Sequence, residues 1–190
     1  MISDENVSGA SEAAPNVTAP LANPFSSTDV VGILQQRGWL AGTPSTAQTA
    51  WCEKASSMLG PHSASRAALA DLLSLIFRYD AAELMTHSET HVTMSRYAAR
   101  DVLRRLAWLV LERTPFDSER FKEVVTALKE GLEIRGRELF HPLRLALAGR
   151  VGEGELDRVI LLVDAAAAAE FPCKIKTIPE RALEFCAAFD

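Results

Sequence analysis

The sequence predicts an all-α fold, and the spacing of its apolar residues is the main reason. In one segment after another, Val, Ile, Leu and Ala recur every three or four residues, as they do on one face of a helix. No stretch alternates apolar and polar residues at a period of two between turn dipeptides, which is the pattern of strands. Gly and Pro residues separate the periodic segments. We therefore expect a compact helical bundle or cage of eight or nine short helices.

The first half of the chain should contain three of these helices and one shorter segment. Ser or Thr stands where each helix begins, and its side chain can accept a hydrogen bond from a free backbone N–H there. Gly38 follows the first apolar stripe, and Gly60 with Pro61 follows the second, so both helices should end at these points. The expected helices span residues 27–38, 46–59 and 65–77, and the short segment spans 81–87.

The second half should contain five more helices. The clearest apolar stripe lies in residues 95–112, with arginines elsewhere around the cylinder. Pro142 suits the first turn of a helix, where its missing N–H is not needed, and Gly149 suits the end of that helix. The expected ranges are 95–112, 117–131, 142–148, 155–169 and 179–188.

Composition and pattern together divide the chain into four parts. Residues 1–26 are rich in Ser, Ala, Asn, Pro and Thr without periodicity, so we expect a disordered tail. The helical region should form one subdomain over residues 27–94 and a second over residues 95–170. Residues 171–190 are a C-terminal extension that we expect to be helical.

The charge distribution limits the classes of partner. The chain has 190 residues and a net charge of −5, with a pI near 5.4. A protein that coats a nucleic-acid duplex usually has a much higher pI, so any contact with nucleic acid should be local. Residues 96–150 carry twelve basic side chains against eight acidic ones and are the basic part of the chain.

Other functional classes find little support in the composition. No apolar run approaches the roughly 20 residues of a membrane span, and no basic leader precedes residue 22, so we expect a cytoplasmic protein without membrane contact. The three cysteines, Cys52, Cys173 and Cys186, have no CxxC spacing. We expect neither a metal nor a cofactor.

One stretch carries a family pattern. Residues 132–163 read LEIRGRELFHPLRLALAGRVGEGELDRVILLV. They resemble, without a gap, the C-terminal end of bacterial glutamyl-tRNA synthetases, whose pattern is approximately GxKxGxLFxPLRxALTG, a short loop and LxxxIxLLG. A weaker resemblance extends back to about residue 27. It covers the helical anticodon-binding half of those enzymes, and the HIGH and KMSKS motifs of the catalytic half are absent from this sequence.

The resemblance implies a partner and a set of binding residues. The partner would be tRNA, of the glutamate type. The chain departs from the family pattern at the residue after Pro61, where some members have an arginine that reads an anticodon base and this chain has a histidine. It also departs at Ala148, where the family has Thr, and at Val163 and Asp164, where it has LG. The residues placed at the RNA by the resemblance are Arg144, Gly149, Arg150, Glu153, Gly154, Leu156 and His62.

Each of these placements has a structural alternative. Arg144 could hold the carbonyls of the loop near Gly149 instead of touching RNA. The loop glycines could serve as a helix C-cap and a flexible connection. The acidic side chains of this loop, Glu153 and Glu155, would repel a phosphate backbone.

A row of arginines gives a second, weaker candidate surface. Arg96, Arg100 and Arg104 lie at i, i+4 and i+8, and would form one ridge if a single helix carries all three. Such a ridge could follow an RNA strand, with Trp108 or Tyr97 as a stacking face. The alternative is a solvated helix face.

Three functional hypotheses remain open. The first is a non-catalytic tRNA- or RNA-binding module that resembles the synthetase anticodon-binding domain. The second is a module derived from that domain that has lost RNA binding and binds a protein of the translation apparatus. The third is the detached C-terminal part of a split synthetase. In none of the three does this chain carry the catalytic site itself.

Overall fold

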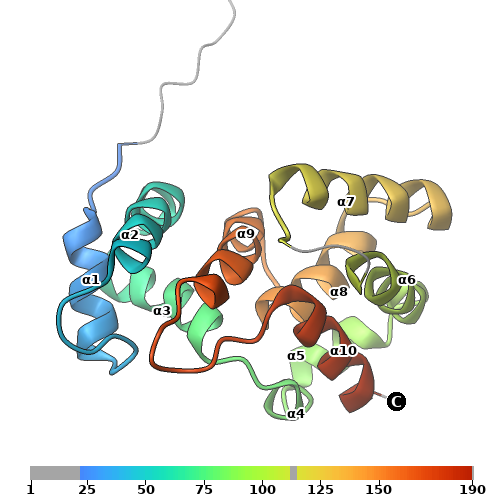
Figure 1. The fold of residues 1–190 in the computed structure, drawn as a ribbon. Helices are drawn as coiled ribbons and strands as arrows, with labels where there is room; N and C mark the ends of the chain where they lie inside the picture. Colours follow the sequence, from blue (N-terminus) through green and yellow to red (C-terminus); the bar gives the residue numbers. More distant parts are fainter. Residues whose placement is uncertain (1–21, 112–114, 190) are drawn as a thin grey trace, which may run out of the picture.

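The described part of the chain is helical throughout, so the all-α prediction is confirmed. The computed structural model describes residues 22–111 and 115–189, and the expected tail therefore lies outside it up to residue 21. The described residues form ten α-helices, one 3₁₀ turn and no strand (Figure 1). The elements are α1 (Ser27–Gln36), α2 (Thr46–Leu59), the 3₁₀ turn η1 (Gly60–His62), α3 (Arg66–Phe77), α4 (Ala81–Leu84), α5 (Ser88–Met94), α6 (Ala99–Leu111), α7 (Ser118–Leu132), α8 (Arg137–Ala148), α9 (Glu155–Ala168) and α10 (Ile178–Phe189).

Short polar side chains begin most of these helices. Ser26 accepts a hydrogen bond from the backbone of Asp29, whose carboxylate accepts one from the backbone of Ser26 in return, and this capping box begins α1. Ser45 and Gln48 form the same arrangement at α2. Single side-chain caps begin α3, α4 and α7, at Ser65, Asp80 and Asp117.

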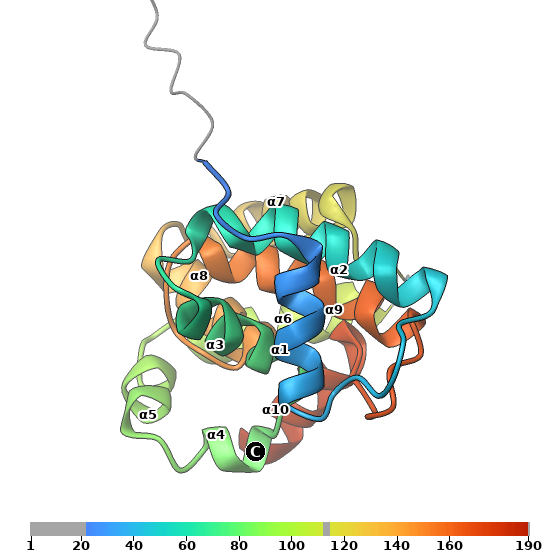
Figure 2. The ribbon, with the colours of Figure 1, turned by 90° about the vertical axis from the view of Figure 1, so that its left-hand side faces the viewer.

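Helix α9 lies at the centre of the molecule. It packs against α2 and α3 on one side and against α8 on the other, so it joins the first three helices to the later ones (Figures 1 and 2). Four aromatic rings close the core on the first side, with centroids 5.0–5.6 Å apart: Trp39, Trp51, Phe77 and Phe171. Because Phe171 comes from the C-terminal extension, this segment completes the core of the first helices.

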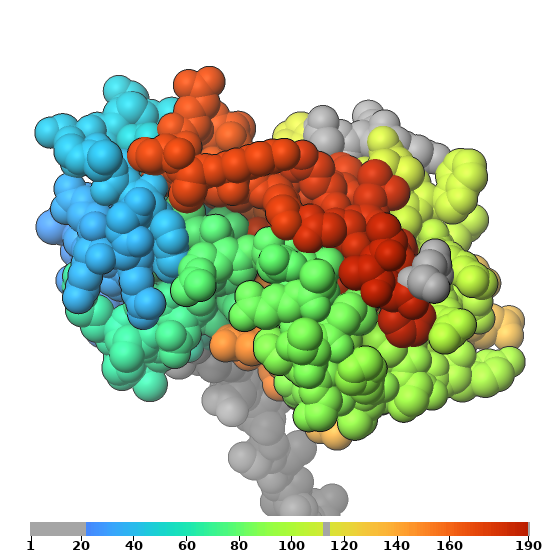
Figure 3. Space-filling view, turned by 90° about the horizontal axis from the view of Figure 1, so that it is seen from below, coloured from blue at the N-terminus to red at the C-terminus, as the bar shows by residue number. Residues whose placement is uncertain are grey.

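The C-terminal extension crosses one face of the molecule. Figure 3 shows its orange and red residues running from the blue first helices to the green and yellow α4–α6 region. Gln48 of α2 donates a hydrogen bond to the carbonyl of Glu170 at the start of this path. Helix α10 then packs against α6, α4 and α8.

A buried arginine anchors α10. Arg181 is completely buried, and its guanidinium donates hydrogen bonds to four backbone carbonyls at 2.6–3.0 Å. Burial lowers its pKa to about 10, so the side chain keeps its charge at neutral pH. The Tyr79 ring lies 4.6 Å below the guanidinium. The four carbonyls belong to Leu75 and Ile76 at the end of α3, Leu147 at the end of α8, and Lys176.

A buried carboxylate on α9 holds the backbone of two other segments. Asp164 of α9 accepts hydrogen bonds from the backbone N–H of Phe116 at 2.9 Å and of Ile178 at 2.8 Å. Ile178 is the first residue of α10 and Phe116 precedes α7. The aspartate that replaces the glycine of the family's LG pair therefore ties the segment before α7 and the start of α10 to the central helix.

Two of the expected helices begin at other residues in the structure, and one helix was not expected. Residues 88–94 form α5, which the sequence analysis did not expect, and α6 begins at Ala99 instead of residue 95. Helix α8 begins at Arg137, so Pro142 lies inside it and not in its first turn. The helix continues through Pro142 because the ring replaces only one N–H, and the carbonyl that loses this donor belongs to the exposed residue Glu138. The division into subdomains at residues 94 and 95 stays a prediction.

We expect Arg181→Met to lower the free energy of unfolding by about 3–5 kcal/mol, because four buried or partly buried carbonyls lose their donor. Urea unfolding followed by circular dichroism measures the change. Arg105→Gln, on an exposed side chain of α6, is the matched control and should change stability by no more than about 0.5 kcal/mol. Equal stability of the two variants would contradict the anchoring role of Arg181.

Candidate functional site

The loop between α8 and α9 contains most of the residues that the sequence analysis placed at the RNA. Gly149 ends α8 in a left-handed conformation with a φ of +80°, which favours glycine. Gly154 precedes α9, and its carbonyl accepts a hydrogen bond from Arg158. Leu156 is fully buried in the core. Gly154 and Leu156 thus shape the loop from within, while Glu153 is exposed.

Arg144 holds this loop from inside. Its Nε and one terminal nitrogen donate to the two carboxylate oxygens of Asp157 at 2.8 and 2.9 Å, and the other terminal nitrogen donates to the carbonyl of Gly152 at 2.7 Å. The guanidinium also lies 4.8 Å from the centroid of the Phe140 ring. Only 9% of the side chain is exposed. The geometry is that of the structural alternative, with the arginine on a loop carbonyl and on the first turn of α9.

Arg150 is the arginine of this loop that faces open space. It lines two cavities, one on each side of the loop. The larger, which we call the α3–α8 cavity, has a volume of about 300 Å³ and lies between the ends of α3 and α8 and the short helices α4 and α5. Its walls include Leu75, Leu84, Leu145 and Val151, and its charged and polar side chains include Arg78, Glu83, His87, Glu89 and Arg150.

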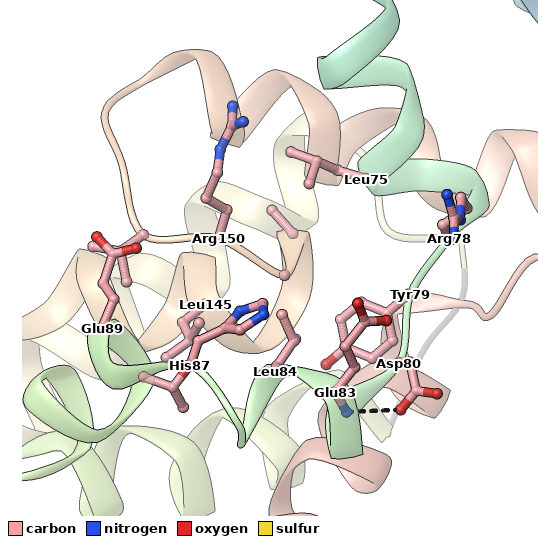
Figure 4. Close-up of a pocket in the computed structure, with 14 residues that line it drawn as sticks. Leu75, Arg78, Tyr79, Asp80, Glu83, Leu84, His87, Glu89, Leu145 and Arg150 are labelled. Carbon is pink, nitrogen blue, oxygen red and sulfur yellow. Dashed lines mark hydrogen bonds between the residues drawn. The ribbon is translucent and has the colours of Figure 1, made fainter.

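The close-up shows how the charges are arranged around the α3–α8 cavity. In Figure 4, Arg150 and Arg78 stand on two sides of it, and Glu83 and Asp80 lie below Arg78, near Tyr79. Neither arginine has an ion-pair partner among the described residues. Asp80 is engaged in capping α4. The cavity therefore has an apolar wall and two cations that are free to meet an anion.

The second cavity brings His62 and Arg150 together. It has a volume of about 290 Å³, and its lining includes His62 of η1, Asp71 of α3 and Glu155 of α9. His62 and Arg150 are 88 positions apart in sequence, and the fold places them at one hollow. We call this hollow the His62 cavity. Sequence analysis singled out both residues separately, through the resemblance alone.

The row of arginines does not form one ridge. Arg96 lies in the turn before α6, so it does not share a helix with Arg100 and Arg104. The Arg100 guanidinium is 4.8 Å from the centroid of the Phe189 ring at the end of α10. Arg104 is exposed, as is Trp108, at 73%. The expectation of a single ridge is wrong, because the chain turns between α5 and α6.

Sequence analysis did not place two of the residues that line the α3–α8 cavity, Arg78 and His87, at an RNA-binding surface. Arg78 immediately follows α3, and His87 immediately precedes α5. Both stand outside helices and in no motif, so only the path of the chain shows that they line the α3–α8 cavity with Arg150. The one sequence signal for Arg78 was its place directly after an amphipathic helix, α3.

The described residues offer no group of three metal-binding side chains. None of the helices in residues 22–111 and 115–189 is both long and apolar enough to cross a membrane. The Cys52 thiol is buried in the core, which raises its pKa to about 11. Its environment is therefore that of a packed core side chain.

Comparison with known proteins now bears on these cavities. The model of the family described as anticodon binding domain matches residues 18–163, which include both cavities and the loop between them. The chain belongs to this family. The match runs from before α1 to near the end of α9, so α10 and the segment leading to it lie beyond the matched residues.

A curated relative agrees with the family match. Glutamate--tRNA ligase 2 of Syntrophus aciditrophicus (strain SB) is 27% identical over 122 residues, which are 61% of this chain and 23% of the relative. The chain thus spans about a quarter of the length of the relative. No solved structure matches the chain.

We expect Arg144 and Asp157 to stabilise the fold together. A double-mutant cycle with Arg144→Gln and Asp157→Asn should give a coupling energy of about 1–3 kcal/mol, because the pair is bidentate and largely buried. Urea unfolding of the four proteins measures it. The exposed pair Lys122–Glu119 is the control and should couple by less than about 0.5 kcal/mol. Equal coupling in the two pairs would refute a structural role for Arg144.

Proposed function

We propose that this domain is a non-catalytic module that binds tRNA, or another structured RNA, at the surface around Arg150. Its membership of the anticodon-binding family supports RNA as the class of ligand. The observation that carries the proposal is the place of Arg150, which lines both cavities and pairs with no carboxylate among the described residues.

The two cavities suit the two parts of a nucleotide. Apolar side chains such as Leu75 and Leu145 give the α3–α8 cavity a surface for the face of a base. Arg78 and Arg150 at its rim are unpaired and can meet the phosphates on either side of that base. In the His62 cavity, the imidazole offers one donor or acceptor to a base edge. Arg144, Gly149, Gly154 and Leu156 support this surface by shaping the loop.

The carboxylates around the site define how strong the binding should be. Glu83, Glu89 and Glu155 line the cavities, and the chain carries a net charge of −5. RNA should therefore bind with modest affinity that falls steeply as salt is added. The same carboxylates favour a second candidate, a basic protein of the translation apparatus bound at this surface.

The name of the curated relative suggests which RNA to examine first. It is a glutamate--tRNA ligase, so we propose tRNA of the glutamate type as the preferred ligand. The relative's name does not bear on any amino-acid activation by this chain, whose match covers the anticodon-binding part. A separate catalytic chain, the third hypothesis, would make aminoacylation appear only on mixing the two.

We expect Arg150→Gln to weaken tRNA binding by roughly tenfold at low salt and to reduce the salt slope by about one, because one phosphate contact is lost. Titration of bulk tRNA, and then of glutamate tRNA, into the purified protein at two salt concentrations measures both effects. Arg105→Gln removes the same charge outside the two cavities and should leave the affinity unchanged.

Three outcomes distinguish the alternatives. Salt-sensitive binding that Arg150→Gln weakens and Arg105→Gln does not weaken supports the proposal. Binding that both variants weaken equally indicates a diffuse contact and contradicts the assigned site. No binding of tRNA to the wild-type protein at low salt rejects the RNA function and favours the protein partner.

A further inference from the structure

A second group of basic side chains lies outside the two cavities, at the beginning of α8. Arg137 is the first residue of α8, and His141 follows it by four positions, so both side chains project from the same face of the helix. Arg96 reaches this face from the turn between α5 and α6, and α5 packs against both α6 and α8. None of the three lines either cavity.

The two arginines are available to a ligand. No ion pair or side-chain hydrogen bond of the described residues involves Arg96 or Arg137. Arg144 also lies near His141, but its charge is already matched by Asp157. Two guanidinium groups beside one imidazole, without an ion pair among the described residues, leave donors that an anion can meet.

His141 also has a polar atom without a partner among the described residues. Its Nδ1 is buried and has no hydrogen-bond partner. Burial, followed by the charges of Arg96 and Arg137, lowers the pKa of His141, while Glu153 acts in the opposite direction and Arg144 in the same. The imidazole is therefore neutral at pH 7. Because an unpartnered buried Nδ1 is better without a proton, the proton belongs on Nε2, where it is a donor for a ligand.

We propose that Arg96, Arg137 and His141 form a binding site for a phosphodiester group of the bound RNA. The site rests on the proposed RNA-binding function and extends it by a phosphate contact beyond the cavities next to Arg150. An anionic oxygen held by two guanidinium groups and one imidazole N–H would supply the charge that this part of the surface lacks. Glu153, exposed on the loop, is the one carboxylate that acts on His141, and it competes with the phosphate.

The first test compares charge-matched variants in tRNA binding. We expect Arg96→Gln and Arg137→Gln each to weaken binding and to reduce the salt slope by about one, whereas Arg105→Gln does neither. Glu153→Gln should strengthen binding, because it removes the competing carboxylate. If wild-type protein binds tRNA and all of these variants bind equally well, the phosphate site is refuted while the function proposed above stands.

The second test uses inorganic phosphate and needs no RNA. The imidazole resonances of the protein are titrated with pH by NMR, in phosphate and in chloride at the same ionic strength, and His141→Gln identifies the signal. Phosphate should raise the titration midpoint of His141, since the bound anion stabilises the imidazolium, and Arg96→Gln with Arg137→Gln together should abolish the effect. An unchanged midpoint refutes the site.

The two tests together separate the sources of the phosphate. A phosphate response with tRNA binding that depends on the same arginines supports the proposal. If phosphate shifts His141 but the wild-type protein binds no tRNA, the site holds free phosphate and both RNA proposals fail. If tRNA does not bind and phosphate does not shift the titration midpoint of His141, both the site and the RNA function are rejected.

Discussion

The buried guanidinium of Arg181 is the interaction on which the rest of the structure depends. A charge removed from water needs close partners, and here these partners are carbonyls, not a hydrogen-bonded carboxylate. The carbonyls at a helix C-terminus have no partner within the helix and carry partial negative charge. Arg181 satisfies such carbonyls on both α3 and α8 at once. The stabilisation is therefore mutual, because the helix ends need a donor as much as the guanidinium needs acceptors.

The hydrogen bonds of Arg181 also fix the backbone next to the candidate site. Arg78 follows α3 and Arg150 follows α8 within three residues of the carbonyls that Arg181 holds. The hydroxyl of Tyr79 reinforces the junction by donating to the carbonyl of Ala146 at 2.6 Å. The two unpaired cations of the α3–α8 cavity thus start from fixed backbone, although their own side chains are free. The C-terminal extension lies beyond the residues of the family match. Through Arg181 it nevertheless fixes the backbone from which these two matched arginines extend.

Sequence reasoning predicted the helices well wherever an apolar stripe and a local cap agree, as in α2 and α7. It failed at α8, because a proline was read as a first-turn residue when its tertiary packing keeps it inside the helix. It left Arg144 with two roles, since the partner that decides between them, Asp157, lies one helix further along the chain. Arg181 drew no notice at all, because a lone arginine in an amphipathic helix gives no sign that its surroundings will be carbonyl oxygens.

Pairing within the fold also limits how RNA can bind. Of the basic side chains near the α8–α9 loop, Arg144 is neutralised by Asp157, so it adds no free charge to the surface. The arginines near this loop without an ion-pair partner among the described residues include Arg78, Arg96, Arg137 and Arg150. Each phosphate contact contributes about 0.7–0.9 to the salt slope. A surface with four such arginines, interrupted by carboxylates, offers only a few phosphate contacts, so charge alone gives modest affinity. Its selectivity must then come from the shape of the cavities between the cations, and the α3–α8 junction held by Arg181 sets the larger of them.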